Sequence, residues 1–371
     1  MSVDDKKLSE LRKGIDSADR EIIEWILKRA EFVRNIGKVK HNDQTPVYRP
    51  DREKEVYKNI LKYAHELYGD SLPLPEAVLK NIYREIMSGS LFIEGGPGIA
   101  FLGPFASFSH MATRKRFGSA VREFPVDTIF DVFRVVESRE DVAYGLVPVD
   151  NSSGGSIGAT LDMLLVSDLK VYAEQYIRVN QNLLAFEDIA LDKIKKIYTI
   201  KIVYEQCRNW LKSNLNMAGI EIVETSSTAA AAQKVAEKKD GVAIASDLAA
   251  ETYGLKIINP NIQDSMNNIT RFFVMGKEQC PPTGDDKTSI VCSVNDKPGS
   301  LYDMLIPFHN AGINLTRIES VATRKTYGDY NFFIDFIGHI GEEKIKKILE
   351  DLETKTSMLK ILGSYPRMDL P

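Results

Sequence analysis

The N-terminal segment has a helical periodicity that limits the fold more than any other feature of the chain. Apolar side chains recur three and four residues apart and fall within about an 80° stripe at 100° per residue. They are Leu8, Leu11, Ile15, Ala18, Ile22, Ile26, Val33 and Ile36. The pattern predicts one helix of roughly 35 residues, which is long for a globular domain. One such rod cannot bury its own stripe, so we expect other helices and a second copy of the chain to cover it.

Two cations fall inside this apolar stripe. Arg29 and Lys40 are eleven residues apart, which is about three helical turns, so they face the same way. A charge in an apolar stripe is costly unless it is paired. Two interpretations stand. Each cation pairs with a glutamate or extends to solvent, or together they bind an anion inside a helical bundle.

Further polar residues fit the second interpretation. Arg12 lies just off the stripe, and Arg52-Glu53 opens a second helix that we expect to begin near Asp51. A third helix should begin near Pro75, which suits a first helical turn, and run to about Glu94. It would place Ser90 and Glu94 one turn apart on one face.

Two clusters of turn residues divide the chain into three blocks, which we expect to span residues 1–95, 97–277 and 287–371. Gly95-Gly96-Pro97-Gly98 ends the helical block, and Cys280-Pro281-Pro282 precedes the last block. The middle block alternates short apolar runs with helical stretches, which predicts an α/β domain with a largely parallel sheet. The last block has the order β-α-β-β-α-β, which is ferredoxin-like.

Composition excludes several classes of protein. The 371 residues carry a net charge of -4, so neither nucleic acid nor an anionic membrane is expected as partner. No apolar run approaches a membrane span, and no signal peptide is visible. The three cysteines form no CxxC pair, and the five histidines show no ligand spacing. We therefore expect a cytoplasmic protein with no metal and no cofactor.

The first block closely resembles the all-helical chorismate mutases. The resemblance rests on LRKGIDSADREIIEWILKRAEFVRNIGKVK followed by YRPDREKEVY. It implies that Arg29 and the partner subunit's Arg12 hold the two carboxylates of chorismate, and that Lys40 donates to the ether oxygen. It also implies that Arg52, Glu53 and Ser90 orient the ring, its hydroxyl and the side chain. Such a rearrangement needs no nucleophile, only a held conformer and stabilised negative charge.

Two positions of this block depart from the family. Many relatives have glutamine where this chain has Glu94, and a glutamate donates only when it is protonated. We therefore expect mutase activity to fall as rising pH ionises Glu94. Arg49 stands where relatives often have an acidic residue, which leaves its contact open.

The middle block resembles prephenate dehydratases across about residues 98 to 276. The segments that carry the resemblance are GPFASFSHMA, VPVDNSSGGSIGATLDML, EQCRNWL, ETSSTAAAAQKVA and NNITRFFVMG. The family fold has two α/β lobes with a cleft between them, like a periplasmic binding protein. The resemblance implies that Thr270 is an oriented donor or proton relay for the leaving hydroxyl. It implies prephenate-binding roles for Asn151 and Gln206, with Ser107, Arg271 and Phe272 as further candidates.

This block also departs from its family. Asp150-Asn151-Ser152 replaces Glu-Asn-Ser, Thr199-Ile200-Lys201-Ile202 replaces Ser-His-Pro-Gln, and Ala106 replaces a glycine. A weakened or inactive dehydratase therefore stays open as an alternative. At Ser226-Ser227-Thr228 a helix start offers either backbone N–H groups for a carboxylate or ordinary N-caps.

The last block resembles an ACT regulatory domain. Gly299 and Leu301 are retained from the family's Gly-Ala-Leu-Val element, and Glu319-Ser320 opens its Glu-Ser-Arg-Pro element. The Arg and Pro are missing, and Arg324 lies further on. The resemblance implies phenylalanine as effector at a pair of such domains, in a homodimer or homotetramer. A dimerisation module without a ligand is the alternative.

Together the three blocks resemble a bifunctional chorismate mutase/prephenate dehydratase. The resemblance implies that the chain converts chorismate to prephenate and then to phenylpyruvate, under feedback inhibition by phenylalanine. Two alternatives remain: a chorismate mutase with a decayed dehydratase, and a non-catalytic sensor of aromatic acids.

Overall fold

The computed structural model describes residues 3–43, 45–294, 297–322 and 330–370 of the chain. The chain divides into two compact units. The first comprises Met1–Arg49, Tyr57–Pro97 and Phe117–Arg122, and the second comprises Pro50–Val56, Gly98–Arg116 and Glu123–Pro371. Among the described residues, none of the helices combines the length and apolar character that spanning a bilayer requires.

The first unit is helical, as the sequence predicts. Its elements are α1 (Val3–Asp43), α2 (Pro50–Tyr68) and α3 (Glu76–Ile93), and the first two turns of α2 belong to the second unit. At 41 residues, α1 is longer than the roughly 35 expected. α2 begins at Pro50, whose fixed φ suits a first turn, and ends before Gly69, at φ +62. α3 begins directly after Pro75, and α1 packs against it.

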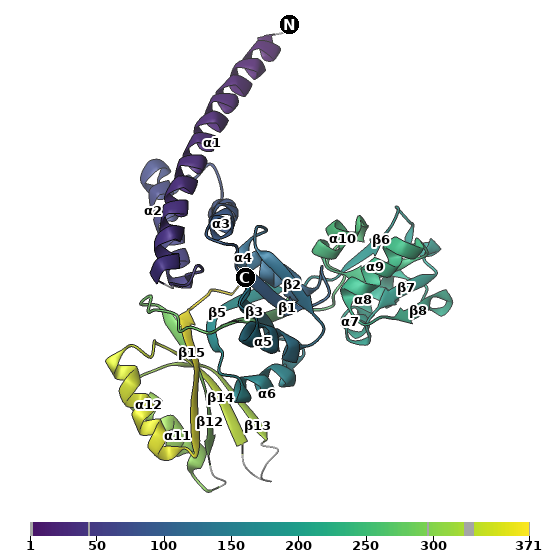
Figure 1. Cartoon of the computed structure of the whole chain (residues 1–371). Helices are drawn as coiled ribbons and strands as arrows, with labels where there is room; N and C mark the ends of the chain where they lie inside the picture. The colour runs from purple at the N-terminus through teal and green to yellow at the C-terminus, as the bar shows by residue number, and fades with distance from the viewer. Residues whose placement is uncertain (1–2, 44, 295–296, 323–329, 371) are drawn as a thin grey trace. The chain divides into compact units, whose positions relative to one another are not determined.

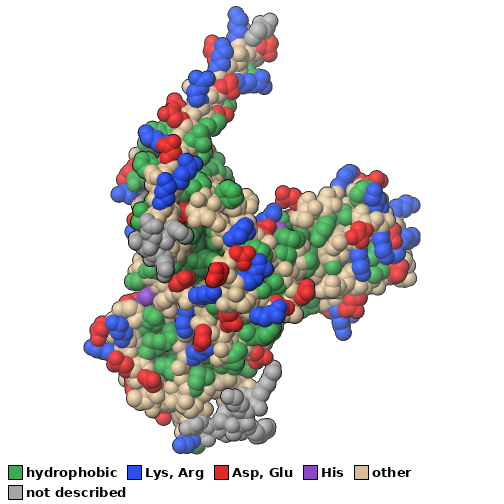
Figure 2. Space-filling model, in the orientation of Figure 1, with side chains coloured by type: hydrophobic (Ala, Val, Ile, Leu, Met, Phe, Trp, Pro, Cys, Tyr) green, Lys and Arg blue, Asp and Glu red, His purple; other side chains and the backbone are tan. Residues whose placement is uncertain are grey.

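Much of the apolar surface of α1 is exposed in the single chain. The N-terminal half of this helix extends beyond the rest of the first unit (Figure 1), and apolar side chains lie along it between charged ones (Figure 2). The exposed large apolar residues are Leu8, Leu11, Ile15, Ile22, Ile23, Trp25, Ile26, Leu27, Phe32, Ile36 and Val39. Apolar stripes of this length are usually buried against another chain.

The second unit begins with a sheet whose strands lie in the order β2-β1-β3-β11-β5, with β4 beside β3. Three helices accompany it: α4 (Phe108–Phe117), α5 (Ile129–Ser138) and α6 (Gly158–Val166). α5 is capped by Thr128, whose hydroxyl accepts from Asp131 N at 3.1 Å, and it buries one apolar face in the core. The strands are β1 (Gly98–Leu102), β2 (Arg122–Val126), β3 (Val142–Asn151), β4 (Gly155–Ser156), β5 (Lys170–Arg178) and β11 (Ile269–Gly276).

A second sheet has the strand order β10-β6-β9-β7-β8. Its strands are β6 (Asn182–Ala185), β7 (Lys196–Thr199), β8 (Glu221–Glu224), β9 (Val242–Ala245) and β10 (Lys256–Asn259). Its helices are α7 (Lys201–Gln206), α8 (Arg208–Asn214), α9 (Thr228–Lys238) and α10 (Asp247–Tyr253), with short 3₁₀ turns η1 (Leu191–Lys193) and η2 (Met217–Gly219). The alanine-rich α9 packs closely on this sheet because its buried side chains are small.

The prediction of a largely parallel sheet was wrong. The middle block forms two mixed sheets, in which β1–β3, β7–β8 and β7–β9 are parallel but β3–β11, β5–β11, β6–β9 and β6–β10 are antiparallel. The antiparallel pairs arise because the chain passes between the sheets twice, at residues 179–181 and 260–268. The returning strand β11 therefore enters the first sheet between β3 and β5. Two backbone hydrogen bonds join the crossing segments, Val179 N to Asn268 O and Ile262 N to Gln181 O, both at 2.7 Å.

The last block has the predicted β-α-β-β-α-β order, with strands arranged β13-β14-β12-β15. Its elements are β12 (Asp286–Val294), α11 (Ser300–Asn310), β13 (Leu315–Ala322), β14 (Tyr330–Ile337), α12 (Glu343–Lys355) and β15 (Met358–Pro366). Both helices share a core with one face of this sheet. The other face contributes Val291, Phe333, Leu362 and Tyr365 to the core of the first α/β sheet. Gly363 is required there, since a Cβ would lie 2.2 Å from Val171 O.

Candidate active sites

The two cations in the apolar stripe of α1 both face α3. Arg29 Nη1 donates to Ser90 Oγ, and Lys40 Nζ lies 2.6 Å from Glu94 Oε2 and 2.9 Å from Val47 O. The side chain of Glu94 is 8% exposed and that of Lys40 is 20% exposed. The structure thus brings four of the predicted mutase residues together in two pairs, three turns apart on α1. Neither cation extends freely into solvent.

The remaining mutase candidates are Arg12 on α1 and Arg52 and Glu53 on α2. Arg12 is exposed on the N-terminal half of α1. Arg52 and Glu53 cluster with the second unit, whereas Arg29, Lys40, Ser90 and Glu94 belong to the first.

The first two turns of α2 interact with other parts of the second unit. Glu53 lies 2.9 Å from Arg116 at the end of α4, and both side chains are mostly buried. Lys54 lies 2.8 Å from Asp285 in the segment before β12. Arg52 is mostly exposed and pairs with Glu55 at 2.5 Å. Sequence reasoning missed Arg116, because nothing near it in the chain marks it as a partner of a residue 63 positions earlier.

The predicted dehydratase pair Asn151 and Thr270 lies on neighbouring strands. They are directly opposite each other where β3 and β11 pair, and Asn151 Nδ2 donates to Thr270 Oγ1 at 2.8 Å. Thr270 is 9% exposed. Since the hydroxyl oxygen accepts this hydrogen bond, its own proton is free to be donated elsewhere.

The orientation of the Asn151 amide is fixed by the backbone that follows it. Its Oδ1 accepts from Ser153 N at 2.9 Å and from Gly154 N at 2.8 Å. Backbone N–H groups can only donate, so this end of the side chain must be the carbonyl. Its Nδ2 donates to Thr270 and to Asn268 Oδ1, the latter at 2.7 Å. Asn151 therefore uses its side-chain donors and acceptor within the protein, and its amide holds the Thr270 hydroxyl. Its contact with prephenate stays a prediction.

Ser107 and Gln206 occupy different surroundings. Ser107 Oγ accepts from His110 N at 3.2 Å and donates to Leu102 O at 3.1 Å, so its hydroxyl caps the start of α4. Gln206 is half-buried at the end of α7, where its carbonyl accepts from Asp264 N at 2.7 Å. Its side-chain amide has no hydrogen-bond partner among the residues that the structure describes, so it remains a candidate for substrate.

The structure shows a capped helix start at Ser226-Ser227-Thr228 and a buried, left-handed conformation at Ala106. Ser227 Oγ accepts from Ala230 N at 3.0 Å, which is the capping interpretation. Ala106, which replaces the family's glycine, is fully buried at φ +63. An L-residue pays about 1–2 kcal/mol for this left-handed conformation. Its N–H donates to His110 Nδ1 at 2.8 Å, and His110 Nε2 lies 2.9 Å from Glu123, so a buried histidine holds this strained loop.

Arg271 and Phe272 do not fit the substrate-binding roles expected of them. Successive side chains of a strand point to opposite faces of the sheet, so Arg271 faces away from Thr270. Its guanidinium is bound to Glu174 at 2.8 Å and to Asp335 at 2.5 Å, with Tyr365 Oη at 3.0 Å. Phe272 is 1% exposed and belongs to the core. Within the triplet, Arg271 is therefore held by ion pairs and Phe272 is buried, whereas Thr270 is hydrogen-bonded to Asn151.

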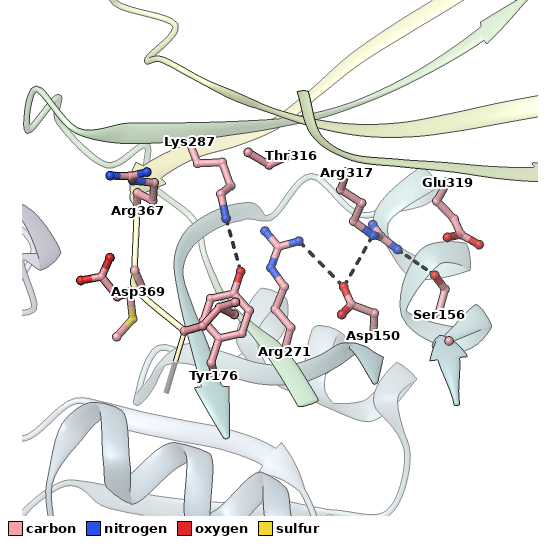
Figure 3. Close-up of a pocket in the computed structure, with 13 residues that line it drawn as sticks. Asp150, Ser156, Tyr176, Arg271, Lys287, Thr316, Arg317, Glu319, Arg367 and Asp369 are labelled. Atoms are coloured by element: carbon pink, nitrogen blue, oxygen red, sulfur yellow. Dashed lines mark hydrogen bonds and ion pairs between the residues drawn. The ribbon is translucent and has the colours of Figure 1, made fainter. Parts of the chain in front are cut away.

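The face of the sheet behind Thr270 borders a hollow of about 620 Å³. Figure 3 shows Arg271 and Arg317 both reaching Asp150, and Lys287 reaching Tyr176. The distances to Asp150 Oδ2 are 3.9 Å from Arg271 and 3.5 Å from Arg317. Arg317 also donates to Ser156 at 2.8 Å. Charged side chains of the last block and of the first α/β sheet thus share one partly buried network.

Two aspartates near the same two arginines have pKa values that are shifted in opposite directions. Burial raises the pKa of Asp150 above its ordinary value, even though Arg271 and Arg317 lower it. Burial also raises the pKa of Asp335, but there Arg271 and Arg317, with a hydrogen bond from Ser289, outweigh it and hold the pKa below its ordinary value. Asp335 therefore has the stronger interactions with the cations, as its 2.5 Å contact with Arg271 indicates.

The residues expected to serve phenylalanine lie at the surface of the last block. Gly299 has φ +89 and precedes α11, and Leu301 in its first turn is 45% exposed. Glu319 and Ser320 lie on β13, where Glu319 is half-buried beside the hollow and Ser320 is exposed. Arg324 lies outside the described residues. Among those described, no cluster of His, Cys, Asp or Glu is arranged to hold a metal ion.

Comparison with known proteins assigns a family to each block. The chorismate mutase type II family matches residues 11–95, the prephenate dehydratase family matches residues 99–280, and the ACT domain matches residues 288–354. The solved prephenate dehydratase from Arthrobacter aurescens, in complex with L-Phe, is 30% identical. It covers 73% of this chain and 90% of its own, with a TM-score of 0.66.

The fold and sites thus define an enzyme with a helical mutase domain, a two-lobed dehydratase domain like a periplasmic binding protein, and a ferredoxin-like ACT domain. Full-length relatives carry the same arrangement. The bifunctional chorismate mutase/prephenate dehydratase of Aquifex aeolicus is 43% identical over 98% of both chains, and that of Pseudomonas aeruginosa is 40% identical over 98% and 99%. This chain belongs to the family of bifunctional chorismate mutase/prephenate dehydratases. It is an enzyme with chorismate mutase and prephenate dehydratase activities.

Proposed function

We propose that the mutase reaction takes place at the two cation pairs of α1 and α3. This proposal rests on one observation: Arg29 and Lys40 point toward α3, where they contact Ser90 and Glu94. Chorismate is a dianion, and its rearrangement places negative charge on the ether oxygen as the C–O bond breaks. Arg29 binds one carboxylate, and the partner subunit's Arg12 binds the other. Lys40 and protonated Glu94 donate to the ether oxygen, while Arg52 and Glu53 orient the ring and its hydroxyl.

Thr270 is the donor for the leaving hydroxyl in the dehydratase reaction. The bond between the ring and its carboxylate breaks, and its electron pair enters the ring as CO2 leaves. The C–O bond opposite breaks, and the departing oxygen takes a proton from Thr270 to form water. Solvent returns one proton to Thr270. The hydrogen bond from Asn151 supports this role, because it leaves the threonine O–H free to donate. Gln206 remains a substrate-binding candidate.

One assay tests both activities together. Purified protein is given chorismate, and phenylpyruvate is measured by its absorbance in alkali. Formation of phenylpyruvate is the expected result. Prephenate without phenylpyruvate would indicate a mutase with a decayed dehydratase, and no product would indicate a non-catalytic sensor.

We further propose that phenylalanine inhibits the enzyme at the ACT domain, near Gly299, Leu301, Glu319 and Ser320. The match to the ACT family and the bound L-Phe in the Arthrobacter relative support this. Isothermal titration calorimetry with phenylalanine should give a binding isotherm. A silent titration would leave the ACT domain as a dimerisation module.

The exposed apolar residues of α1 support a homodimer or homotetramer, in which the stripe is buried against a second copy. Sedimentation equilibrium would measure this directly. We also propose a cytoplasmic location, small molecules as the only other partners, and domain boundaries at residues 1–95, 97–277 and 287–371.

A further inference from the structure

Asn268 is a buried residue beside the dehydratase pair. It lies within the NNITRFFVMG segment, but the resemblance implied no role for it. It precedes β11 and ends the second crossing between the two α/β sheets. Its backbone carbonyl accepts a hydrogen bond from Val179 N, in the other crossing segment, at 2.7 Å. The residue is only 3% exposed. Ligands of two-lobed domains bind between the lobes, where such crossings lie. Asn268 is therefore held at the junction by both its backbone and its neighbours.

The orientation of the Asn268 side chain follows from that of Asn151. Backbone N–H groups of Ser153 and Gly154 fix the carbonyl of Asn151, so its Nδ2 faces Asn268. The Asn268 atom that accepts from it must be Oδ1. Its Nδ2 then points away from Asn151. Thr270 is in the same situation, because its oxygen also accepts from Asn151 and its proton points elsewhere.

The Nδ2 group of Asn268 has no acceptor among the residues that the structure describes. Among the described residues, Gln181 Oε1 is the one side-chain polar atom that is both fully buried and without a partner. The unpartnered Nδ2 of Asn268 is therefore in contact with solvent. A nearly buried amide that lacks an acceptor is unfavourable, and such groups normally bind water or a ligand. Asn268 thus offers two N–H donors beside the hydroxyl of Thr270.

We propose that Asn268 is a substrate-contacting residue of the dehydratase, whose amide N–H groups donate to an oxygen of the prephenate dianion while its carbonyl positions Asn151. This inference rests on the proposed role of Thr270. The amide of Asn151 donates to the acceptor atoms of Asn268 and Thr270. The N–H groups of Asn268 and the O–H of Thr270 therefore point away from Asn151. Donors without a competing acceptor suit a carboxylate or a leaving hydroxyl.

Asn268→Asp separates the two functions of this side chain. A carboxylate keeps the acceptor for Asn151 but replaces the free N–H groups by an oxygen that repels an anionic substrate. We expect the KM for prephenate to rise by about tenfold or more, equal to about 1.4 kcal/mol. Asn267→Asp is the matched control, because Asn267 is the same residue type next in the chain and is exposed. It should leave KM and kcat unchanged. Mutase activity of each variant reports whether the protein is folded.

Several results would overturn the proposal. Asn268→Asp with a KM within about twofold of the Asn267→Asp control would do so, and so would a fall in kcat alone. If Asn268→Asp loses mutase activity and hence its fold, Asn268→Ala decides by the same measurement, with a raised KM as the supporting result. Thr270→Val is measured alongside. If it keeps dehydratase activity, the proposed role of Thr270 fails, whatever the Asn268 variants do.

Discussion

The proposed mutase and dehydratase residues differ in charge and in how they are held. In the first unit, Arg29 and Lys40 lie against Ser90 and Glu94, so two cations face a hydroxyl and a carboxyl group on α3. In the second unit, Thr270 and its neighbours Asn151 and Asn268 are neutral, and charged side chains lie on the opposite face of the strands.

The difference follows from the chemistry. A rearrangement that moves no proton needs fixed charge against a developing anion, whereas expulsion of hydroxide needs a proton donor of fixed orientation. A helix positions cations by spacing alone, because every third or fourth residue shares a face. The direction of a hydroxyl proton does not follow from residue spacing. Its direction depends on which partner donates to the oxygen.

The largest effect should come from removing a cation of the mutase site. Arg29→Met should lower kcat/KM for chorismate by about 10²–10³-fold, because a fixed charge complementary to the transition state is lost. Turnover of added prephenate should not change. Arg34→Met makes the same chemical change at an exposed position of α1 and serves as control. Equal losses in both reactions would argue against separate sites.

Thr270→Val should have the reverse effect. The side chain keeps its shape but loses its proton, so phenylpyruvate formation should fall by about 10²-fold or more, with mutase activity retained. The measurement is prephenate turnover in a variant whose chorismate turnover is normal. If both activities fall together in folded protein, the two units would not act independently.

Breaking the charged network behind Thr270 should change stability more than chemistry. Asp335→Asn removes one of the carboxylates that pair with the buried Arg271. Such a loss typically lowers the free energy of unfolding by about 3–5 kcal/mol. Because the pKa of Asp335 is held below its ordinary value, its contribution to stability is present above the unfolded value of about 3.9 and is lost as pH falls. Urea denaturation followed by Trp210 fluorescence, in a Trp25→Phe background, measures this. A variant with unchanged acid sensitivity would contradict it.

Glu94→Gln should produce the smallest change at neutral pH, less than about tenfold in mutase kcat/KM. Its main effect should be on the pH profile. Wild-type activity should fall as rising pH ionises Glu94, whereas the amide donates at every pH. A profile that keeps its slope in the variant would mean that Glu94 does not donate.

Helix spacing and motif order predicted a large part of this protein. The three blocks, their fold classes and the cations on one face of α1 all follow from the sequence, because these features depend on local periodicity and on residues close in the chain. The antiparallel return of β11 did not follow, since it depends on a crossing between two sheets. The partners Glu53–Arg116 and Arg271–Asp335 also lay beyond reach, as each joins residues more than sixty positions apart.

The dehydratase residues show most clearly where sequence stops and tertiary structure begins. The motif NNITRF alone indicated Thr270, but it could not tell which neighbours face the substrate. Strand pairing placed Arg271 on the opposite face, and the backbone after Asn151 fixed the direction of two amides and one hydroxyl. Residue types are local information, whereas the direction in which a donor points depends on the groups that folding places around it.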